Sequence, residues 1–211
     1  MAHSYIKGLK IIENFITADD EAKIIKAIDA ESWSSVIGRR TQQYGYVYDY
    51  KTKSKSGVMA KATKDISEVK ELANVADKLK TLYDDKLPTQ CIINEYLRNQ
   101  GISAHIDSPI FGPVIVSISL GADCNMTFTA KKNTAGTGNT AGTSYTAGTG
   151  DVVGVCLPRL SAVVLTGESR YIWTHEIPAH TTYNNSTGES IKKAADYRRV
   201  SLTFRTLAEK K

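Results

Sequence analysis

The sequence predicts an α+β domain with a jelly-roll core, a double-stranded β-helix, and two N-terminal helices packed on one of its sheets. Two amphipathic patterns precede residue 90, and they predict helices over 18–30 and 67–84. After residue 90, nearly every apolar run is short and bounded by turn residues. Eight strands are expected there, over 90–96, 102–106, 114–121, 125–129, 151–155, 162–166, 170–175 and 199–206.

The first helix has a start signal as well as an apolar face. Thr17 precedes Ala-Asp-Asp-Glu, which is typical of a capped helix N-terminus, and Ile24, Ile25 and Ile28 follow at helical spacing. The second helix has an apolar stripe and ends before Leu87-Pro88; its stripe consists of Val69, Leu72, Val75, Leu79 and Leu82. We expect both helices to support the sheet and to carry no chemistry.

The length and composition indicate a single globular domain. The chain has 211 residues, of which 41% are hydrophobic and 23% charged. It has no run of eighteen apolar residues and no apolar core of a signal peptide, so we expect an intracellular protein, cytoplasmic or nuclear, with no membrane partner. We also expect a monomer. The net charge of +5 permits a polyanionic partner but does not require one.

Three cysteines, Cys91, Cys124 and Cys156, lie in apolar runs without CxxC spacing and are expected to be free thiols. Residues 131–150 form an insert in which Ala-Gly-Thr recurs, and such small polar residues cannot bury a core. We expect a flexible hairpin extension there that tolerates deletion, and a second loose loop over 181–195. The lysine-rich residues 51–64 either form a mobile loop that contacts phosphates or are simply solvated.

A histidine and a carboxylate stand two residues apart at the second predicted strand. In an extended segment His105 and Asp107 point to the same side, so they can bind one metal ion together. They supply two of the three ligands in the 2-His-1-carboxylate triad of non-haem Fe(II) enzymes. The third candidate is His175, which the fold would have to bring beside them; His180, in an expected loop, is the alternative.

Six motifs occur in order along residues 10–207: Asn94-x-Tyr96, His105-x-Asp107, Val116-Ser-Ile-Ser-Leu-Gly121, Gly167-Glu-Ser-Arg-Tyr171, Trp173-Thr-His175 and Arg199-x5-Arg205. In identity, order and spacing they resemble the AlkB family of Fe(II)- and 2-oxoglutarate-dependent nucleic-acid dioxygenases. The residues of these motifs are most similar to those of the branch that contains the tRNA wobble-uridine hydroxylase. The resemblance implies Fe(II) as the metal, and 2-oxoglutarate and O2 as cosubstrates.

The resemblance also implies how 2-oxoglutarate binds. Arg199 would hold its distal carboxylate, Arg205 would lie near the C1 end, and Asn94 and Tyr96 would donate hydrogen bonds. The two arginines lie on one side of the last predicted strand, about 20 Å apart if it is straight. Either that strand bends, or the arginines serve opposite ends of the site. Ser201 stands where the family often has Asn, which leaves one contact to the cosubstrate in doubt.

The predicted substrate-binding residues are Arg39, Arg40, Tyr44, Tyr46 and Tyr48. Every second residue from 44 to 50 is tyrosine, which on one strand gives a face of four rings beside two arginines. Such a face could stack an extruded base, or the tyrosines could merely cover the sheet. In AlkB relatives the corresponding segment forms part of the nucleotide-recognition lid, and this resemblance favours substrate binding.

The expected reaction couples decarboxylation of 2-oxoglutarate to hydroxylation of a C–H bond in RNA or single-stranded DNA. On an N-methyl base the product releases formaldehyde, which is oxidative demethylation, whereas a carbon side chain gives a stable alcohol. Three alternatives stay open: base demethylation, hydroxylation of a tRNA wobble uridine, and a catalytically weak nucleic-acid-binding module of the same fold.

Overall fold

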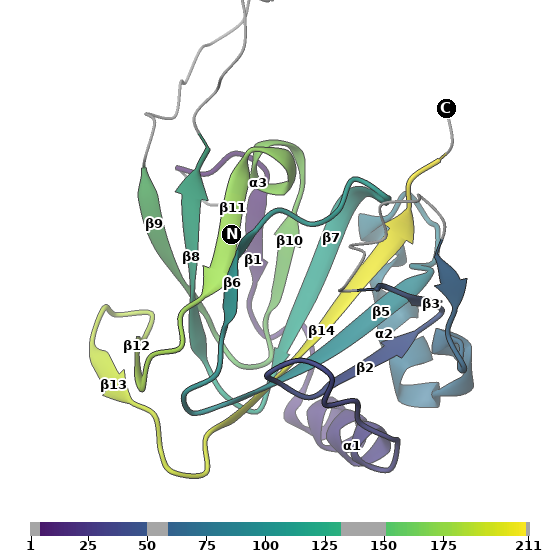
Figure 1. Ribbon diagram of the computed structural model, residues 1–211, viewed down its shortest axis with the longest axis horizontal. Helices are drawn as coiled ribbons and strands as arrows, with labels where there is room; N and C mark the ends of the chain where they lie inside the picture. Colours follow the sequence, from purple (N-terminus) through teal and green to yellow (C-terminus); the bar gives the residue numbers. More distant parts are fainter. Residues whose placement is uncertain (1–4, 50–58, 132–150, 210–211) are drawn as a thin grey trace, which may run out of the picture.

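The computed structural model describes residues 5–49, 59–131 and 151–209, and two antiparallel sheets form the core of this part of the chain (Figure 1). The larger sheet has the strand order β1-β10-β7-β14-β5-β2. Its strands are β1 (Leu9–Ile12), β2 (Thr41–Tyr44), β5 (Gln90–Leu97), β7 (Phe111–Leu120), β10 (Ala162–Leu165) and β14 (Arg198–Leu207). The smaller sheet has the order β6-β11-β8-β9, with β6 (Ile102–His105), β8 (Cys124–Ala130), β9 (Val152–Leu157) and β11 (Trp173–Ile177). The expected jelly-roll core is confirmed.

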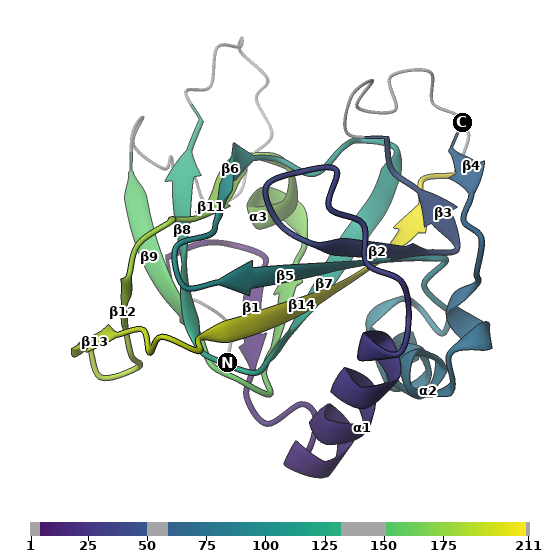
Figure 2. The same ribbon diagram turned by 60° about the horizontal axis from the view of Figure 1, so that its bottom comes forward.

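Two helices cover the outer face of the larger sheet, as Figure 2 shows. They are α1 (Ala18–Asp29) and α2 (Lys70–Leu79), and the short 3-10 helices η1 (Ile66–Glu68) and η2 (Lys80–Leu82) flank α2. Thr17 caps α1, because its side chain accepts a hydrogen bond from the Asp20 amide while the Asp20 carboxylate accepts one from the Thr17 amide. Both predicted helices are confirmed, although the second is shorter than 67–84 because 3-10 turns form its ends.

Two predictions in the C-terminal half are wrong in part. The expected strand over 170–175 begins with a short helix, α3 (Gly167–Tyr171), because Gly167 adopts a positive φ of 48° and reciprocal hydrogen bonds between Thr166 and Ser169 cap the turn. The expected loose loop over 181–195 contains a hairpin of β12 (Thr182–Asn184) and β13 (Ser190–Lys192). Asn185 closes that hairpin, since its side chain accepts hydrogen bonds from Thr187 and Glu189.

Side chains of the central strand β14 alternate between two environments. Val200, Leu202 and Phe204 belong to the apolar cluster between the larger sheet and the helices. The intervening residues face the space between the two sheets; they are Arg199, Ser201, Thr203 and Arg205. A second apolar cluster, which includes Phe128, Trp173 and Ile177 of the smaller sheet, closes that space from the other side. The fold therefore places two arginines inside the jelly roll.

The cysteine prediction is confirmed: Cys91, Cys124 and Cys156 are free thiols, and the first two are buried. Outside the described residues lie 132–150 of the insert predicted over 131–150, 51–58 of the lysine-rich segment 51–64, and Tyr50. In the described part of the chain, no helix is both long and apolar enough to cross a membrane.

Candidate metal and cosubstrate site

Strand pairing in the smaller sheet brings the two distant histidines together. β6 pairs antiparallel with β11, so that His105 lies opposite His175, and their ring centroids are 4.4 Å apart. Asp107 follows β6, and one ligand atom from each of the three residues lies within 4.8 Å of the others. His180, the alternative, is exposed in the segment after β11 and is not part of this group. The three residues predicted as metal ligands thus form one group of potential ligands.

Each histidine of this group is in a form suited to metal binding. His105 Nδ1 lies 2.8 Å from the Ser103 carbonyl oxygen, which can only accept, so Nδ1 is the donor in this contact and Nε2 is the nitrogen left to bind a metal. Burial lowers the pKa of His175 to about 4, although the nearby Asp107 carboxylate opposes this change. His175 is therefore neutral near pH 7. Its Nε2 lies 3.6 Å from Asp107 Oδ2.

Asp107 supplies the negative charge of the group. Burial raises the pKa of its carboxyl, but Arg205 and then the two histidines lower it, and the balance lies below the usual range. Arg205 Nη2 donates a hydrogen bond of 2.5 Å to Asp107 Oδ1, and the Arg205 guanidinium lies 4.5 Å from the centre of the Phe111 ring. An ionised carboxylate beside two imidazoles is the donor set of a facial Fe(II) site.

Arg199 is a second arginine of β14 that faces the interior, and it lacks a carboxylate partner among the described residues. It is 0% exposed, and its Nη2 donates a hydrogen bond of 2.9 Å to Ser119 Oγ. Its Nε and Nη1 have no hydrogen-bond partner in the described part of the chain. A buried guanidinium in this state is costly, and its free donors match the geometry of a bound carboxylate. β14 pairs regularly with β5 from Arg198 to Arg205, so no bulge brings Arg199 and Arg205 together.

The strand beside β14 positions the other predicted cosubstrate residues. Asn94 lies opposite Ser201 and Tyr96 opposite Arg199 in the pairing of β5 with β14. Arg39 joins this group, since its Nε donates a hydrogen bond of 2.8 Å to Asn94 Oδ1 and its guanidinium lies 5.5 Å from the centre of the Tyr96 ring. Arginine only donates, so the Asn94 oxygen must face Arg39 and its amide nitrogen points elsewhere. Arg39, predicted to contact the substrate, thus contacts residues predicted to bind 2-oxoglutarate.

The predicted face of four tyrosines is wrong, because the strand that would carry it is interrupted. Gly45 has a φ of +76°, and a Cβ there would lie 2.0 Å from the Thr89 carbonyl oxygen, so only glycine fits. β2 therefore ends at Tyr44. The Tyr44 side chain is buried in the cluster under the helices, and its hydroxyl donates to Gln42 Oε1, so it is not accessible to a substrate.

Tyr46 and Tyr48 follow this break and lie apart from Tyr44. Tyr46 lies in β3 (Tyr46–Val47), which pairs with β4 (Ala60–Lys61), and the Lys61 ammonium lies 4.8 Å from the centre of its ring. The ring centroids of Tyr48 and Phe111 are 6.0 Å apart, and the Phe111 ring in turn contacts the Arg205 guanidinium. Tyr46 and Tyr48 are both half-buried.

Arg40 points to the helix-covered side of the sheet. It donates hydrogen bonds of 2.6 and 2.7 Å to the carboxylate of buried Glu95, and its guanidinium lies 4.9 Å from the centre of the Trp33 ring. Arg198 donates a third hydrogen bond to Glu95. Glu95 follows Asn94 and precedes Tyr96 on β5, so its side chain lies on the other face. The structure therefore does not bring Arg40 to the group predicted to bind ligands.

Ser119 is a further polar residue of the interior, which the sequence motifs did not single out. Besides its contact with Arg199, it lies opposite Ser201 in the pairing of β7 with β14. Two residues along the same strands, Ser117 and Thr203 share a hydrogen bond of 2.8 Å between their hydroxyls. The signal was present in the sequence: serines at alternate positions of an otherwise apolar strand mark the face that meets polar groups.

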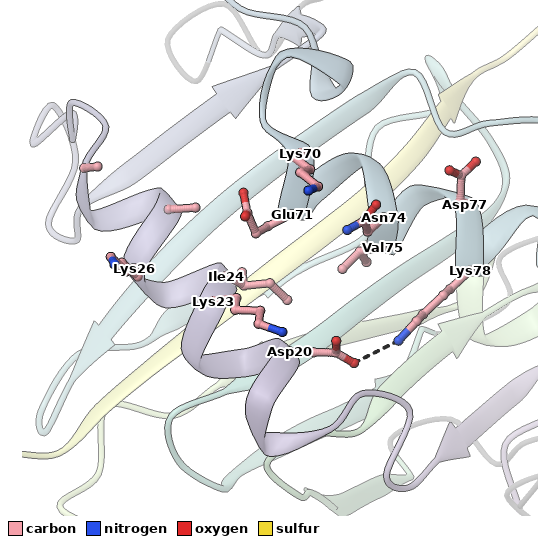
Figure 3. A pocket seen from close by; sticks show the side chains of 12 residues that line it. Asp20, Lys23, Ile24, Lys26, Lys70, Glu71, Asn74, Val75, Asp77 and Lys78 are labelled. Atoms are coloured by element: carbon pink, nitrogen blue, oxygen red, sulfur yellow. Dashed lines mark hydrogen bonds and ion pairs between the residues drawn. The ribbon is translucent and has the colours of Figure 1, made fainter.

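A hollow of about 840 Å³ lies elsewhere on the molecule, between α1 and α2 (Figure 3). Its walls carry lysines and acids in similar numbers, and Lys78 and Asp20 pair across it at 2.9 Å. Because α1 and α2 cover the outer face of the larger sheet, this hollow is separated by that sheet from the triad and from Arg199. It contains none of the residues predicted to bind metal, cosubstrate or substrate.

Comparison with known proteins decides the family. Residues 8–205 match the 2OG-Fe(II) oxygenase superfamily. The chain belongs to this superfamily. It is a dioxygenase domain whose cofactor is Fe(II) and whose cosubstrates are 2-oxoglutarate and O2, and its His105-Asp107-His175 group could bind the metal.

Two relatives and one solved structure refine this assignment. The chain is 32% identical over 183 residues to the tRNA (carboxymethyluridine(34)-5-O)-methyltransferase ALKBH8 of Macaca fascicularis. This alignment covers 81% of the chain and 24% of the relative. The chain is 30% identical over 213 residues to the alkylated DNA repair protein ALKBH8 homolog of Arabidopsis thaliana. This alignment covers 95% of the chain and 58% of the relative. The chain thus spans about a quarter and somewhat more than half of these relatives.

The solved structure of OsALKBH1 has the same fold, with a TM-score of 0.61 at 16% identity over 94% of this chain and 98% of that one. The resemblance to the AlkB family is confirmed. Members of the family that are similar to this chain are named for action on tRNA, on DNA and on RNA.

Proposed function

We propose that this dioxygenase oxidises a base in RNA or single-stranded DNA, at Fe(II) held by His105, Asp107 and His175. 2-Oxoglutarate would extend from that ion along the interior to Arg199. The observation that carries the proposal is the placement of both groups between the same two sheets: a complete donor set beside Arg205, and an unpaired guanidinium at Arg199. Each group fits one end of the cosubstrate, because 2-oxoglutarate chelates a metal at one end and presents a carboxylate at the other.

Each of these side chains has its own task in the proposed reaction. Arg205 engages Asp107 Oδ1, so Oδ2, the oxygen that faces His175 Nε2, is the one left to ligate the metal. Bound Fe(II) would supply the activation of O2 that decarboxylates 2-oxoglutarate and hydroxylates the substrate. Arg199 would form a bidentate pair with the distal carboxylate, supported by Ser119.

The remaining cosubstrate contacts come from β5 and β14. Arg39 turns the Asn94 oxygen towards itself, which leaves the Asn94 amide nitrogen as a donor to 2-oxoglutarate. Tyr96 would add a further hydrogen bond beside Arg199, and Ser201, opposite Asn94, would add a smaller polar contact. These residues orient the cosubstrate and keep its charge paired inside an otherwise apolar core.

A nucleic-acid substrate is supported by aromatic and basic side chains near the proposed metal site. Tyr48 adjoins Phe111, Phe111 adjoins Arg205, and Arg205 holds the Asp107 ligand, so Tyr48 is well placed to stack on a base that reaches the metal. Tyr46 with Lys61 adds a ring and a cation for a neighbouring nucleotide. The net charge of +5 and the names of relatives that act on nucleic acids agree with this substrate class.

A second candidate within this class is hydroxylation of a wobble-uridine side chain in tRNA. The similarity to ALKBH8, at 32% identity across 81% of the chain, favours it. The two candidates differ in their products, since N-demethylation releases formaldehyde and side-chain hydroxylation does not.

The test is succinate formation by Fe(II)-loaded protein given 2-oxoglutarate and O2, with methylated RNA and DNA oligonucleotides or with bulk tRNA. We expect succinate to rise with one of these nucleic acids and formaldehyde to accompany it only for an N-methyl substrate. His175→Ala should abolish the rise, whereas the matched control His180→Ala, outside the ligand group, should retain it. Tight oligonucleotide binding without succinate under any condition would instead identify a nucleic-acid-binding module.

A further inference from the structure

Arg170 has no role in the function described so far, although it is one of the most deeply buried charges. It is 2% exposed, lies in α3 and has no ion pair with any carboxylate in the described ranges. Its guanidinium donates only to backbone carbonyls, those of Asp107 (2.8 Å), Ser108 (2.8 Å), Phe111 (3.3 Å) and Gly112 (3.3 Å). A charge this buried needs such partners, because an unpaired one would be strongly unfavourable.

All of these carbonyls belong to one short segment, residues 107–112. This segment leaves the smaller sheet at β6, crosses between the sheets and enters the larger sheet at β7 (Figure 1). The segment therefore curves around the planar fork of Arg170, which can satisfy several acceptors at fixed angles. Asp107 is its first residue, so Arg170 holds the main chain of this ligand while Arg205 holds its side chain.

The same guanidinium also connects two of the three metal ligands. α3 leads directly into β11, which carries His175, so Arg170 and His175 are presented by one continuous piece of chain. The segment that Arg170 binds carries Asp107. The hydrogen bonds of Arg170 thus fix the segment that carries Asp107 against the segment that carries His175. They are independent of the strand pairing that places His105 opposite His175.

We propose that Arg170 is a positioning residue, which sets the Asp107 carboxylate opposite His175 before the metal binds and so raises the affinity for the metal. This inference rests on the proposed function, since it requires that Asp107 and His175 are metal ligands. A pre-set ligand loses less conformational freedom on binding than a mobile one, and removing a residue that orients a metal ligand typically weakens binding about 10–100-fold.

The test compares Arg170→Met, Arg170→Lys and Ser169→Ala with the native protein in titrations with Mn²⁺ alone. Methionine removes every donor, so the dissociation constant for Mn²⁺ should rise by about 10–100-fold. Lysine keeps the charge but reaches fewer carbonyls, so the dissociation constant of Arg170→Lys for Mn²⁺ should lie between those of the native protein and Arg170→Met. Ser169→Ala removes the cap of the same short helix and leaves the guanidinium in place, so it should lower Tm without changing the affinity for Mn²⁺.

A role in stability alone would give a different pattern. The decisive readout is the free energy of stabilisation that Mn²⁺ adds in each protein, obtained from the rise in Tm and the unfolding entropy, because this free energy depends on the affinity and not on the stability of the metal-free state. Arg170 variants that are less stable yet gain the native free energy of stabilisation would overturn the proposal, and Arg170→Lys provides this reading if Arg170→Met does not fold. His175→Ala distinguishes the failure of the proposed function: if that variant binds Mn²⁺ as the native protein does, the triad is not the metal site.

Discussion

Replacement of Arg199 by methionine is expected to stabilise the ligand-free protein and to abolish binding of 2-oxoglutarate. Arg199 is 0% exposed, and its Nε and Nη1 have no hydrogen-bond partner among the described residues. Methionine is an unbranched apolar side chain that can fill the same space without any donor to satisfy. The native residue is therefore expected to lower stability until the cosubstrate arrives.

The magnitude follows from the contacts that Arg199 makes and lacks. Each unsatisfied buried donor group costs about 1–3 kcal/mol, so its two unpaired nitrogens together cost roughly 2–6 kcal/mol. Methionine would lose the hydrogen bond to Ser119 and the contact of the guanidinium with the Tyr96 ring, at about 1 kcal/mol each. The net gain is about 2 kcal/mol, which corresponds to a rise in Tm of roughly 4–8 °C for a domain of this size.

The assay is thermal unfolding with and without Mn²⁺ and 2-oxoglutarate, since Mn²⁺ replaces Fe(II) without turnover. At a cosubstrate concentration of 100 times Kd, the native protein should gain about 2.7 kcal/mol, so the order of the two Tm values should reverse. Arg198→Met is the matched control. Arg198 lies next in the chain but pairs with Asp29 and Glu95 on the other face, so its loss should lower Tm and leave the response to 2-oxoglutarate intact.

Two results would refute this reasoning. If Arg199→Met lowered the Tm of the ligand-free protein as much as Arg198→Met does, the guanidinium would not be a buried group in need of a partner. If Arg199→Met kept the rise in Tm with 2-oxoglutarate, another residue would bind the distal carboxylate.

Three further predictions concern residues around the site. Arg39→Ala should weaken 2-oxoglutarate binding by about 5–10-fold in calorimetric titration, because one hydrogen bond that orients Asn94 is lost, while oligonucleotide affinity stays near the native value. Tyr48→Ala should weaken oligonucleotide binding in fluorescence anisotropy by about 5–100-fold, the equivalent of one lost stacking contact. Glu95→Gln should cost about 2 kcal/mol at pH 7 in chemical denaturation, less than a fully buried pair because the Arg40 side chain is 47% exposed.

Controls, contrary outcomes and a dependence on pH test these predictions further. Tyr44→Phe, buried under the helices, should leave oligonucleotide binding unchanged, and an equal loss in both tyrosine variants would contradict a specific stack at Tyr48. If Arg39→Ala weakened only oligonucleotide binding, Arg39 would be a substrate-binding residue and would not act on 2-oxoglutarate through Asn94. For Glu95, the hydrogen bond from Arg40 lowers the pKa below its usual 4.5 although burial raises it. The contribution of ionised Glu95 to stability is therefore present above pH 4.5 and is lost as the pH falls further. The difference in free energy of unfolding between the native protein and Glu95→Gln should then become smaller in acid.

The sequence was most informative where a local period decides the outcome. The apolar faces of both helices and the alternation along 199–205 follow from periods of 3.6 and 2 residues, so the shared inward direction of Arg199 and Arg205 follows from their spacing in the chain. The same rule fails where the backbone leaves the regular state. The positive φ of Gly45 ends β2 after Tyr44 and so breaks the alternation that would have continued to Tyr46 and Tyr48, and the capped turn at Gly167 replaces the start of an expected strand.

The sequence by itself therefore determined the kind of fold, the family and the candidate ligands, because these depend on residue type, order and local spacing. Only the tertiary structure decided that His105 lies opposite His175, that Arg39 contacts Asn94, that Arg40 is tied to Glu95, and that Arg170 holds the segment after Asp107. The physical reason is that these contacts join residues far apart in the chain. Their geometry is set by strand register and by the need of each buried charge for a partner, and neither can be read from one segment alone.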